Sequence, residues 1–143
     1  MYKHLRFYLL PEVEFRKLQQ NALRSQKSDQ SEVCGIITTN KNKILKLWFL
    51  ENLSRRAGAF LIDLSEVGRV QKLVKETGQH IIGSFHSHPI SPPFPSPGDL
   101  KAAFFKGHEL IYDVCGRAVK LWLKKSRFRV VELPLKIGGT PDK

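Results

Sequence analysis

The sequence predicts a single α+β domain, in which a mixed β-sheet is flanked by about three helices. Three observations support this fold class. The chain has 143 residues, enough for one hydrophobic core. Short apolar runs of strand length recur along it, and helix start and stop signals stand between them. Because no repeat or low-complexity linker interrupts this pattern, residues 1–143 are expected to form one domain.

The first part of the chain predicts a strand, a helix and a hairpin. Residues 6–10 (RFYLL) predict a short strand, and Pro11 is expected to open an amphipathic helix, because proline suits the first helical position. The apolar face of this helix consists of Phe15, Leu18, Ala22 and Leu23. Residues 25–31 predict a polar loop. The runs at 33–39 and 44–50 (VCGIITT and ILKLWFL) predict a hairpin of central strands.

The middle of the chain predicts a second helix between two strands. Residues 60–62 (FLI) predict a short strand. Asp63, followed three residues later by Glu66, is typical of a helix start of the capping-box kind. The apolar stripe of this helix consists of Val67, Val70 and Val74, and Gly78 is expected to stop it. Residues 80–85 (HIIGSF) then predict a buried strand.

The remaining chain predicts a short helix and three strands. The helix is expected at 96–107, ending at Gly107, and the strands at 109–115, 118–124 and 127–131. Residues 135–143 are expected to form a loose C-terminal tail. A Gly-Gly pair lies in this tail, but residues follow it, so a flexible terminus is favoured over the end of a ubiquitin-like modifier.

Composition limits the classes of protein and partner. No apolar run reaches the roughly 18 residues of a membrane span, and the N-terminus does not resemble a signal peptide. With Cys34 and Cys115 as the only cysteines, a reducing cytoplasm is the expected location. The net charge is +11, and residues 114–131 are basic without an acidic residue. This stretch is either a patch for an acidic partner or nucleic acid, or the solvated face of a hairpin, which its period-two alternation favours.

Two histidines stand where a predicted strand meets a proline-rich loop. In an extended chain His86 and His88 project to the same face, so both imidazoles can bind one metal ion. Pro89 stops the strand, and the loop returns the chain to Asp99, which can supply an oxygen ligand. Two imidazoles and one carboxylate leave a zinc ion an open position, as in catalytic sites. The alternative is that Ser96 caps a helix and Asp99 only favours its dipole.

A hydrolytic metal site also needs a base that is not a ligand. Glu32 begins the predicted central strand EVCGII and is the best placed carboxylate. Cys34 lies two residues later on the same side of the strand, where a small buried side chain is favoured over a ligand. His4, His80 and His108 have no motif partners.

Glu32, His86-Ser87-His88-Pro89, Ser96 and Asp99 together resemble the signature Glu…His-Ser-His-Pro-x₆-Ser-x-x-Asp of the JAMM (JAB1/MPN+) metalloproteases. The similarity covers most of the chain. It implies an MPN fold, with an architecture like that of the cytidine deaminases, and one Zn²⁺ per chain held by His86, His88 and Asp99. Glu32 would activate the attacking water, and Ser96 would stabilise the oxyanion unless it serves only as a helix cap.

The short chain is most similar to the compact stand-alone prokaryotic members of the family. These cleave the amide bond at the C-terminus of a ubiquitin-like or sulfur-carrier protein with a Gly-Gly tail, and the basic surface would suit an acidic partner of this kind. Two alternatives stay open: a RadC-like DNA-associated protein that uses the basic stretch, and a non-catalytic MPN scaffold. Neither a membrane nor, under the first interpretation, a nucleic acid is expected as partner.

Overall fold

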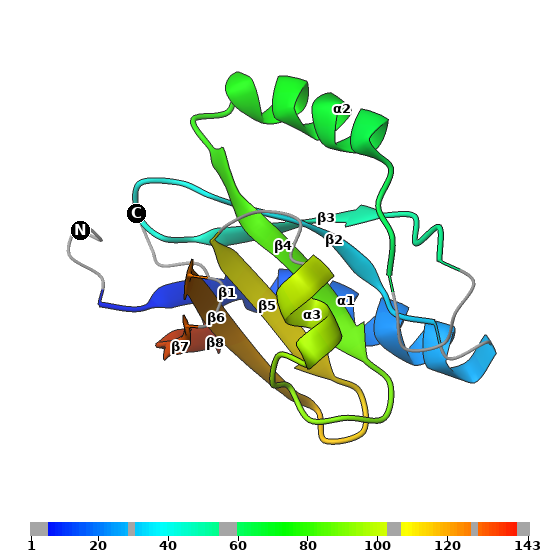
Figure 1. The fold of residues 1–143 in the computed structure, drawn as a ribbon. Helices are drawn as coiled ribbons and strands as arrows, with labels where there is room; N and C mark the ends of the chain where they lie inside the picture. The colour runs from blue at the N-terminus through cyan, green and yellow to red at the C-terminus, as the bar shows by residue number, and fades with distance from the viewer. Residues whose placement is uncertain (1–5, 29–30, 55–59, 103–106, 127–128, 140–143) are drawn as a thin grey trace.

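A six-stranded mixed sheet forms the centre of the computed structural model (Figure 1), which describes residues 6–28, 31–54, 60–102, 107–126 and 129–139. In spatial order its strands are β3 (Leu45–Leu50), β2 (Cys34–Thr39), β4 (His80–His88), β5 (His108–Asp113), β6 (Ala118–Ser126) and β7 (Arg129–Leu133). The central pair β4 and β5 is parallel, and the other neighbours are antiparallel. The predicted fold class is therefore confirmed.

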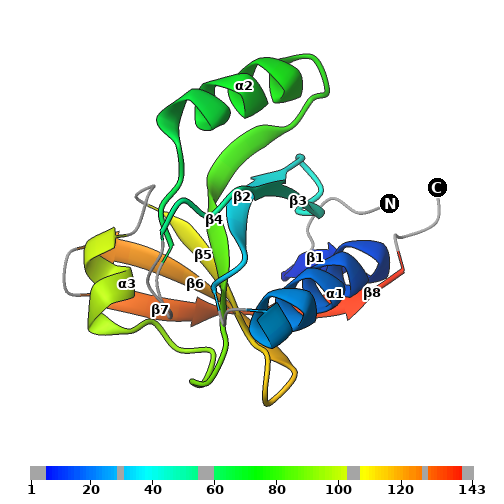
Figure 2. The ribbon, with the colours of Figure 1, turned by 90° about the vertical axis from the view of Figure 1, so that its right-hand side faces the viewer.

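Helices cover both faces of this sheet, as Figure 2 shows. Helix α1 (Glu12–Ser28) packs on one face, and α2 (Leu64–Lys75) and α3 (Pro97–Ala102) lie on the other. Alternation along the strands separates two cores, because neighbouring residues point to opposite faces. The α1 core contains Leu10, Leu18, Ala22, Ile37, Leu45, Leu47, Phe85, Leu110, Tyr112, Val114 and Leu121. The α2 core contains Cys34, Ile36, Ile62, Val67, Val70 and Val74.

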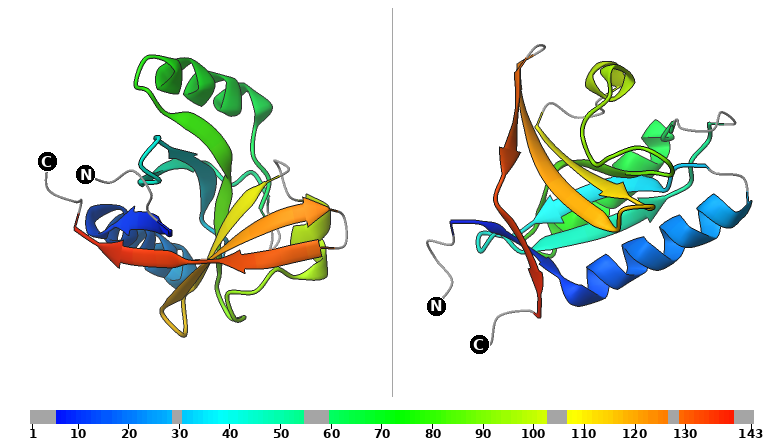
Figure 3. Two further views of the ribbon diagram at one scale, coloured as in Figure 1. Left: turned by 90° about the vertical axis from the view of Figure 1, so that its left-hand side faces the viewer. Right: turned by 90° about the horizontal axis from the view of Figure 1, so that it is seen from below.

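The prediction of a loose tail at 135–143 is wrong for residues 135–138. Leu135–Gly138 forms strand β8, which pairs in parallel with β1 (Tyr8–Pro11) in a separate two-stranded sheet (Figure 3). The pairing joins the two ends of the described chain, so it depends on a partner more than 120 positions away. A local pattern does not reveal such a partner. Residues 140–143 lie outside the described part of the chain.

Several element boundaries also differ from the expectations. Pro11 ends β1, so α1 begins at Glu12, and α1 continues to Ser28 through most of the expected polar loop. Residues 60–62 form no strand, although the Leu53 amide donates to the Leu61 carbonyl. The third helix is assigned only to Pro97–Ala102, and residues 103–106 lie outside the described part.

The remaining helices and strands form near their predicted positions, although Leu23, expected on the apolar face of α1, is exposed. The hairpin of β2 and β3 forms, and Asp63 caps α2 by accepting the Ser65 amide at 2.9 Å. The Glu66 carboxylate contacts Arg69 instead of completing a capping box. No helix in the described part of the chain combines the length and the apolar character that a bilayer crossing requires.

The basic stretch at 114–131 forms the paired strands β6 and β7, as the hairpin interpretation predicted. Two of its cations are engaged within the molecule. Lys120 makes an ion pair with Glu132 at 2.9 Å, and the Lys124 ammonium donates to the Leu100 carbonyl in α3. Arg127 lies outside the described residues. This part of the surface is therefore less available to an external polyanion than the sequence alone indicated.

Candidate metal centre

The two histidines of the motif converge at the end of β4, as their spacing predicted. His86 and His88 are both buried, and their Nε2 atoms lie 3.1 Å apart. Asp99 of α3 faces them, with Oδ1 3.1 Å from Nε2 of His86 and Oδ2 2.9 Å from Nε2 of His88. One donor atom from each of the three residues lies within 4.8 Å of the others. This set of nitrogen and oxygen donors suits a zinc ion.

Asp99 is held by a reciprocal capping box with Ser96. The Ser96 hydroxyl oxygen accepts the Asp99 amide at 3.0 Å, and the Asp99 carboxylate accepts the Ser96 amide at 2.9 Å. Asp99 therefore takes part in a helix cap and also faces both imidazoles. The two alternatives from the sequence, a capping residue or a metal ligand, do not exclude each other. Because a hydroxyl can accept and donate at the same time, capping leaves the Ser96 proton available.

The Nδ1 atoms of the two imidazoles, on the side of each ring away from Asp99, have different partners. Nδ1 of His88 lies 2.7 Å from the carbonyl oxygen of Pro92 in the loop. Nδ1 of His86 lies 3.0 Å from the carboxylate of Glu109 in β5, and the Ser84 hydroxyl donates to the same carboxylate oxygen at 3.0 Å. Sequence reasoning missed Glu109. The one available signal was a carboxylate in a short, otherwise apolar strand, which is a weak indication of contact with a distant histidine.

The electrostatics of this cluster favour a bound cation. Burial alone lowers the pKa of His86, but the hydrogen bonds and charges of Asp99 and Glu109 outweigh burial and raise it to about 10. The pKa of His88 is also raised, because its bond to Asp99 outweighs burial. Burial raises the pKa of Asp99, but the bonds from both imidazoles hold it well below its usual value. The carboxylates thus create a site that stabilises positive charge, either as protons or as a metal ion.

Glu32, the carboxylate that the sequence suggested as a base, lies two residues before β2 and near enough to the cluster for its charges to act on the side chain. Its side chain is buried, and Oε1 has no hydrogen-bond partner among the described residues. Burial is the main cause that raises the pKa of Glu32 to about 6, and the charges that act on it include those of His86, His88 and Asp99. A buried carboxylate oxygen without a partner is uncommon in proteins and makes Glu32 a candidate functional residue.

The segment that carries Glu32 is hydrogen-bonded directly to β4, the strand that carries both histidines. The amide of Val33 donates to the Ser87 hydroxyl at 2.9 Å, and the Ser87 amide donates to the Val33 carbonyl at 2.9 Å. On the other side, the Asn52 side chain donates to the Glu32 carbonyl at 2.8 Å. Ser87 therefore points away from the face of β4 that carries the two imidazoles, as expected. Its hydroxyl holds the backbone at Val33, next to Glu32.

Three distant side chains anchor the proline-rich loop. The Trp122 indole donates to the Pro93 carbonyl at 3.0 Å, Gln26 of α1 donates to the Pro89 carbonyl at 2.8 Å, and Cys115 donates to the same carbonyl. The ring of Phe94 packs on that of Trp122. Sequence reasoning missed these anchors, because each bond joins residues that are far apart in the chain.

Among the described residues, Cys34, His80 and His108 do not belong to this group of donors. Cys34 is buried, and burial raises the pKa of its thiol to about 12, which fits the small buried side chain expected there. His108 contacts the hydroxyl of Tyr8 at 3.1 Å, and His80 is exposed at the opposite end of β4. His4 lies outside the described residues.

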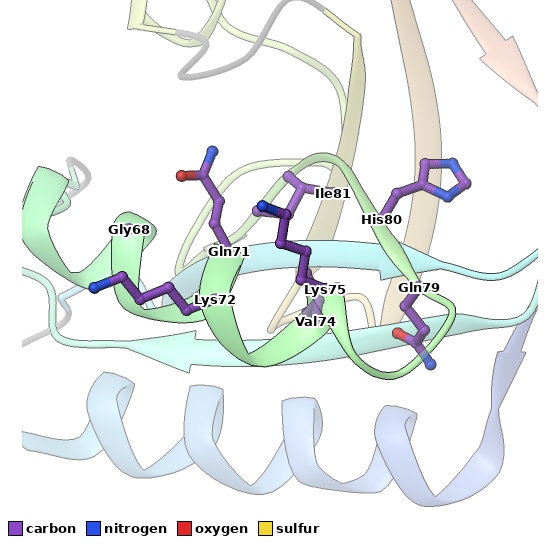
Figure 4. Close-up of a pocket in the computed structure, with 8 residues that line it drawn as sticks. All are labelled: Gly68, Gln71, Lys72, Val74, Lys75, Gln79, His80 and Ile81. Atoms are coloured by element: carbon purple, nitrogen blue, oxygen red, sulfur yellow. The ribbon is translucent and has the colours of Figure 1, made fainter.

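A separate hollow of about 600 Å³ lies between α2 and the beginning of β4 (Figure 4). Its lining consists of Gly68, Gln71, Lys72, Val74, Lys75, Gln79, His80 and Ile81. His80 and His88 stand at opposite ends of β4, about 25 Å apart at roughly 3.3 Å per residue. The hollow is therefore remote from His86, His88 and Asp99. We place the candidate functional site at these three residues because of their chemistry, although the hollow is the roomier feature.

Comparison with known proteins supports the family resemblance that the motif indicates. Residues 16–128 match the prokaryotic homologs of the JAB domain. The desampylase of Pyrococcus furiosus is 26% identical over 115 residues, covering 79% of this chain and 81% of that protein. The desampylase of Haloferax volcanii is 26% identical over 88 residues, covering 59% of this chain and 62% of that protein.

Solved structures share the fold. Protein DSY2949 from Desulfitobacterium hafniense has a TM-score of 0.79 at 23% identity, covering 94% of both chains. AF2198, a JAB1/MPN domain protein from Archaeoglobus fulgidus, has a TM-score of 0.57 at 18% identity, covering 91% of this chain and 98% of that one. The family match spans all the residues from Glu32 to Glu109 described above. The chain belongs to the prokaryotic homologs of the JAB domain, which confirms its resemblance to the compact prokaryotic JAMM proteins.

Proposed function

We propose that this protein is a zinc-dependent metallo-isopeptidase or peptidase that hydrolyses the amide bond after the C-terminus of a ubiquitin-like or sulfur-carrier protein. The observation that carries the proposal is the convergence of His86, His88 and Asp99 beside the buried side chain of Glu32, whose Oε1 atom has no hydrogen-bond partner among the described residues. The two desampylases provide the support for a JAMM-type hydrolase.

The residues present fit a divalent metal ion. His86, His88 and Asp99 would hold it through two nitrogen atoms and one oxygen atom, and both imidazoles have hydrogen-bond partners at Nδ1 that leave Nε2 for the ion. When bound, zinc supplies Lewis acidity that lowers the pKa of water toward neutrality and polarises a carbonyl group.

Glu32 and Ser96 would carry the proton and oxyanion chemistry. With a pKa raised to about 6, the Glu32 carboxylate can accept a proton from water near neutral pH. The water oxygen then bonds to the substrate carbonyl carbon, the C–N bond breaks, and Glu32 returns its proton to the leaving amine. The Ser96 hydroxyl, which already accepts the Asp99 amide, is able to donate to the oxyanion.

The proposed substrate is an acidic modifier with an extended Gly-Gly tail. A net charge of +11 favours association with an acidic protein by electrostatic steering. Both cysteines are free thiols, which suits the cytoplasmic location we propose together with this substrate class.

The central test is cleavage of a purified ubiquitin-like fusion by the wild type and by Glu32→Gln. The variant keeps the shape of the side chain but cannot accept the proton, so we expect the rate to fall by about 10²- to 10⁴-fold. Its zinc content, measured by elemental analysis, should equal that of the wild type. Glu14→Gln, at a buried carboxylate that accepts the Leu47 amide, is the matched control and should retain activity.

The test also separates the alternatives. Cleavage by Glu32→Gln at the wild-type rate would refute the assigned base. A wild type that binds zinc, cleaves no fusion and binds DNA with strong salt dependence would favour the RadC-like alternative. A wild type that binds neither zinc nor DNA would favour the scaffold.

A further inference from the structure

We propose that Glu109 is a positioning residue of the metal centre, which fixes His86 through Nδ1 and supplies the second of two negative charges that match a divalent ion. The inference rests on the metal centre of the proposed function and assigns a role to a residue outside the family signature. It also predicts that Ser84 supports Glu109.

The sheet register brings these groups together. In the parallel pairing of β4 with β5, Ser84 lies directly opposite Glu109, and His86 lies two residues further on the same face as Ser84. The Oε2 atom of Glu109 receives the Ser84 hydroxyl at 3.0 Å and lies 3.0 Å from Nδ1 of His86. Both bonds are buried, so the contact depends on the two central strands and on no flexible loop.

The contact determines which nitrogen of His86 faces the ion. An ionised carboxylate only accepts hydrogen bonds, so the bond to Glu109 keeps a proton on Nδ1. Nε2, which faces Asp99 and His88, is then the nitrogen that would give up its proton to bind an ion. The ring of Phe60 stacks on the imidazole at a centroid distance of 4.8 Å and an interplanar angle of 22°. His86 is thus fixed at its edge by Glu109 and at its face by Phe60.

The neighbouring histidine shows that orientation alone does not require a carboxylate. His88 has the equivalent bond from Nδ1, but its partner is the uncharged carbonyl of Pro92. Placing a carboxylate in the sheet interior costs desolvation, which an opposite charge can offset. Among the described residues, Asp99 and Glu109 are the carboxylates in contact with the imidazoles, and together they supply two negative charges, opposite in sign to those of a divalent ion. Glu109 therefore contributes to metal affinity by its charge as well as its hydrogen bond.

The test measures zinc affinity by competition with a chromophoric chelator, without any substrate. Glu109→Gln keeps an acceptor oxygen but loses the charge, and we expect zinc to bind about tenfold more weakly; Glu109→Ala loses both and should weaken binding by up to about 100-fold. Ser84→Ala should have a smaller effect in the same direction. Glu14→Gln, at an equally buried carboxylate away from the site, should lower thermal stability and leave zinc affinity unchanged.

The outcomes distinguish this inference from the proposed function. Equal zinc affinity in the wild type and Glu109→Gln would overturn the role of Glu109 even if the wild type cleaves its substrate. Weaker zinc binding by Glu109→Gln, with a thermal unfolding profile of the zinc-free variant like that of the wild type, supports it even if no fusion is cleaved. Absence of zinc binding by the wild type would overturn both proposals.

Discussion

The metal centre has two halves that are held in place by different means. His86, Glu109 and the segment of Glu32 belong to the central strands, where sheet register fixes them. Asp99 and Ser96 belong to a short helix and its cap, where they bond to each other, and single hydrogen bonds from distant side chains hold the loop that precedes them. The first half is therefore as rigid as the sheet, whereas the second half depends on a few contacts that can be removed one at a time.

This difference has a functional consequence. An ion held between the halves needs all three donors, but only the loop-borne donor can move without disrupting the sheet. The proline-rich loop reduces that freedom, because prolines restrict the backbone and lower the entropy of ordering it. We therefore expect removal of a strand-borne ligand to abolish zinc binding, and variants in the loop anchors to weaken it in smaller, graded steps.

The largest expected effect comes from removing a strand-borne ligand. His88→Ala deletes one of three donors, and zinc binding at micromolar concentrations should be lost in equilibrium dialysis, a weakening of more than about 100-fold. His108→Ala is the matched control, since His108 is half-buried and bonds to Tyr8 away from the cluster. Stoichiometric zinc in His88→Ala would show that the three donors do not act as one site.

An intermediate effect is expected from loosening the loop-borne half. Trp122→Phe removes the hydrogen bond to the Pro93 carbonyl but keeps an aromatic ring beside Phe94. One such bond contributes roughly 1 kcal/mol, so zinc affinity should fall by about three- to tenfold in a chelator competition assay.

The second tryptophan provides the control for this substitution. Trp48→Phe removes a similar bond, from the indole to the Thr38 hydroxyl at 2.8 Å, but this bond has no link to the loop. Zinc affinity should stay at the wild-type value in Trp48→Phe. A similar loss in both variants would mean that the loop anchors act only through overall stability.

The remaining effect is on folding stability instead of zinc affinity, and it arises from the electrostatics of Glu32 in the strand-borne half. The pKa of Glu32 is raised to about 6 in the fold from an ordinary value of 4.5, so burial disfavours its ionised form. This residue therefore stabilises the zinc-free protein most fully below pH 4.5, and the contribution is lost as pH rises through about 6. A difference of 1.5 pKa units corresponds to about 2 kcal/mol.

Glu32→Gln removes this titration. In zinc-free protein, the free energy of unfolding of the variant should rise relative to the wild type by about 2 kcal/mol between pH 4 and pH 7, as measured by urea denaturation with chelator present. A constant difference across this range would show that Glu32 is well solvated and would weaken its assignment as the base.

Sequence patterns with short range predicted much of the site. The two-residue spacing of His86 and His88 placed both imidazoles on one face, and the three-residue spacing of Ser96 and Asp99 predicted the cap that holds the carboxylate. Both inferences use only the geometry of neighbouring residues in a strand or at a helix start, which does not depend on the rest of the fold. The same holds for the hairpin of β2 and β3 and for the Asp63 cap of α2.

The errors arose where a residue's environment is set by a distant segment. Residues 135–138 read as a loose tail because their partner strand begins at Tyr8, and the expected polar loop at 25–31 begins inside α1, where Gln26 bonds to Pro89. Neither segment has a strong local signal of its own. Tertiary contact decided their structure, as it commonly does for weakly patterned segments.

The sequence by itself determined the family of this protein and predicted its candidate metal donors and the carboxylate beside them, because these follow from residue type and short spacing. Only the tertiary structure decided what surrounds those donors: Glu109 behind His86, Trp122 and Gln26 against the loop, and β8 beside β1. The reason is physical. Spacing along a chain fixes which way neighbouring side chains point, whereas strand order and register, which arise from packing the whole core, fix which distant side chains they meet.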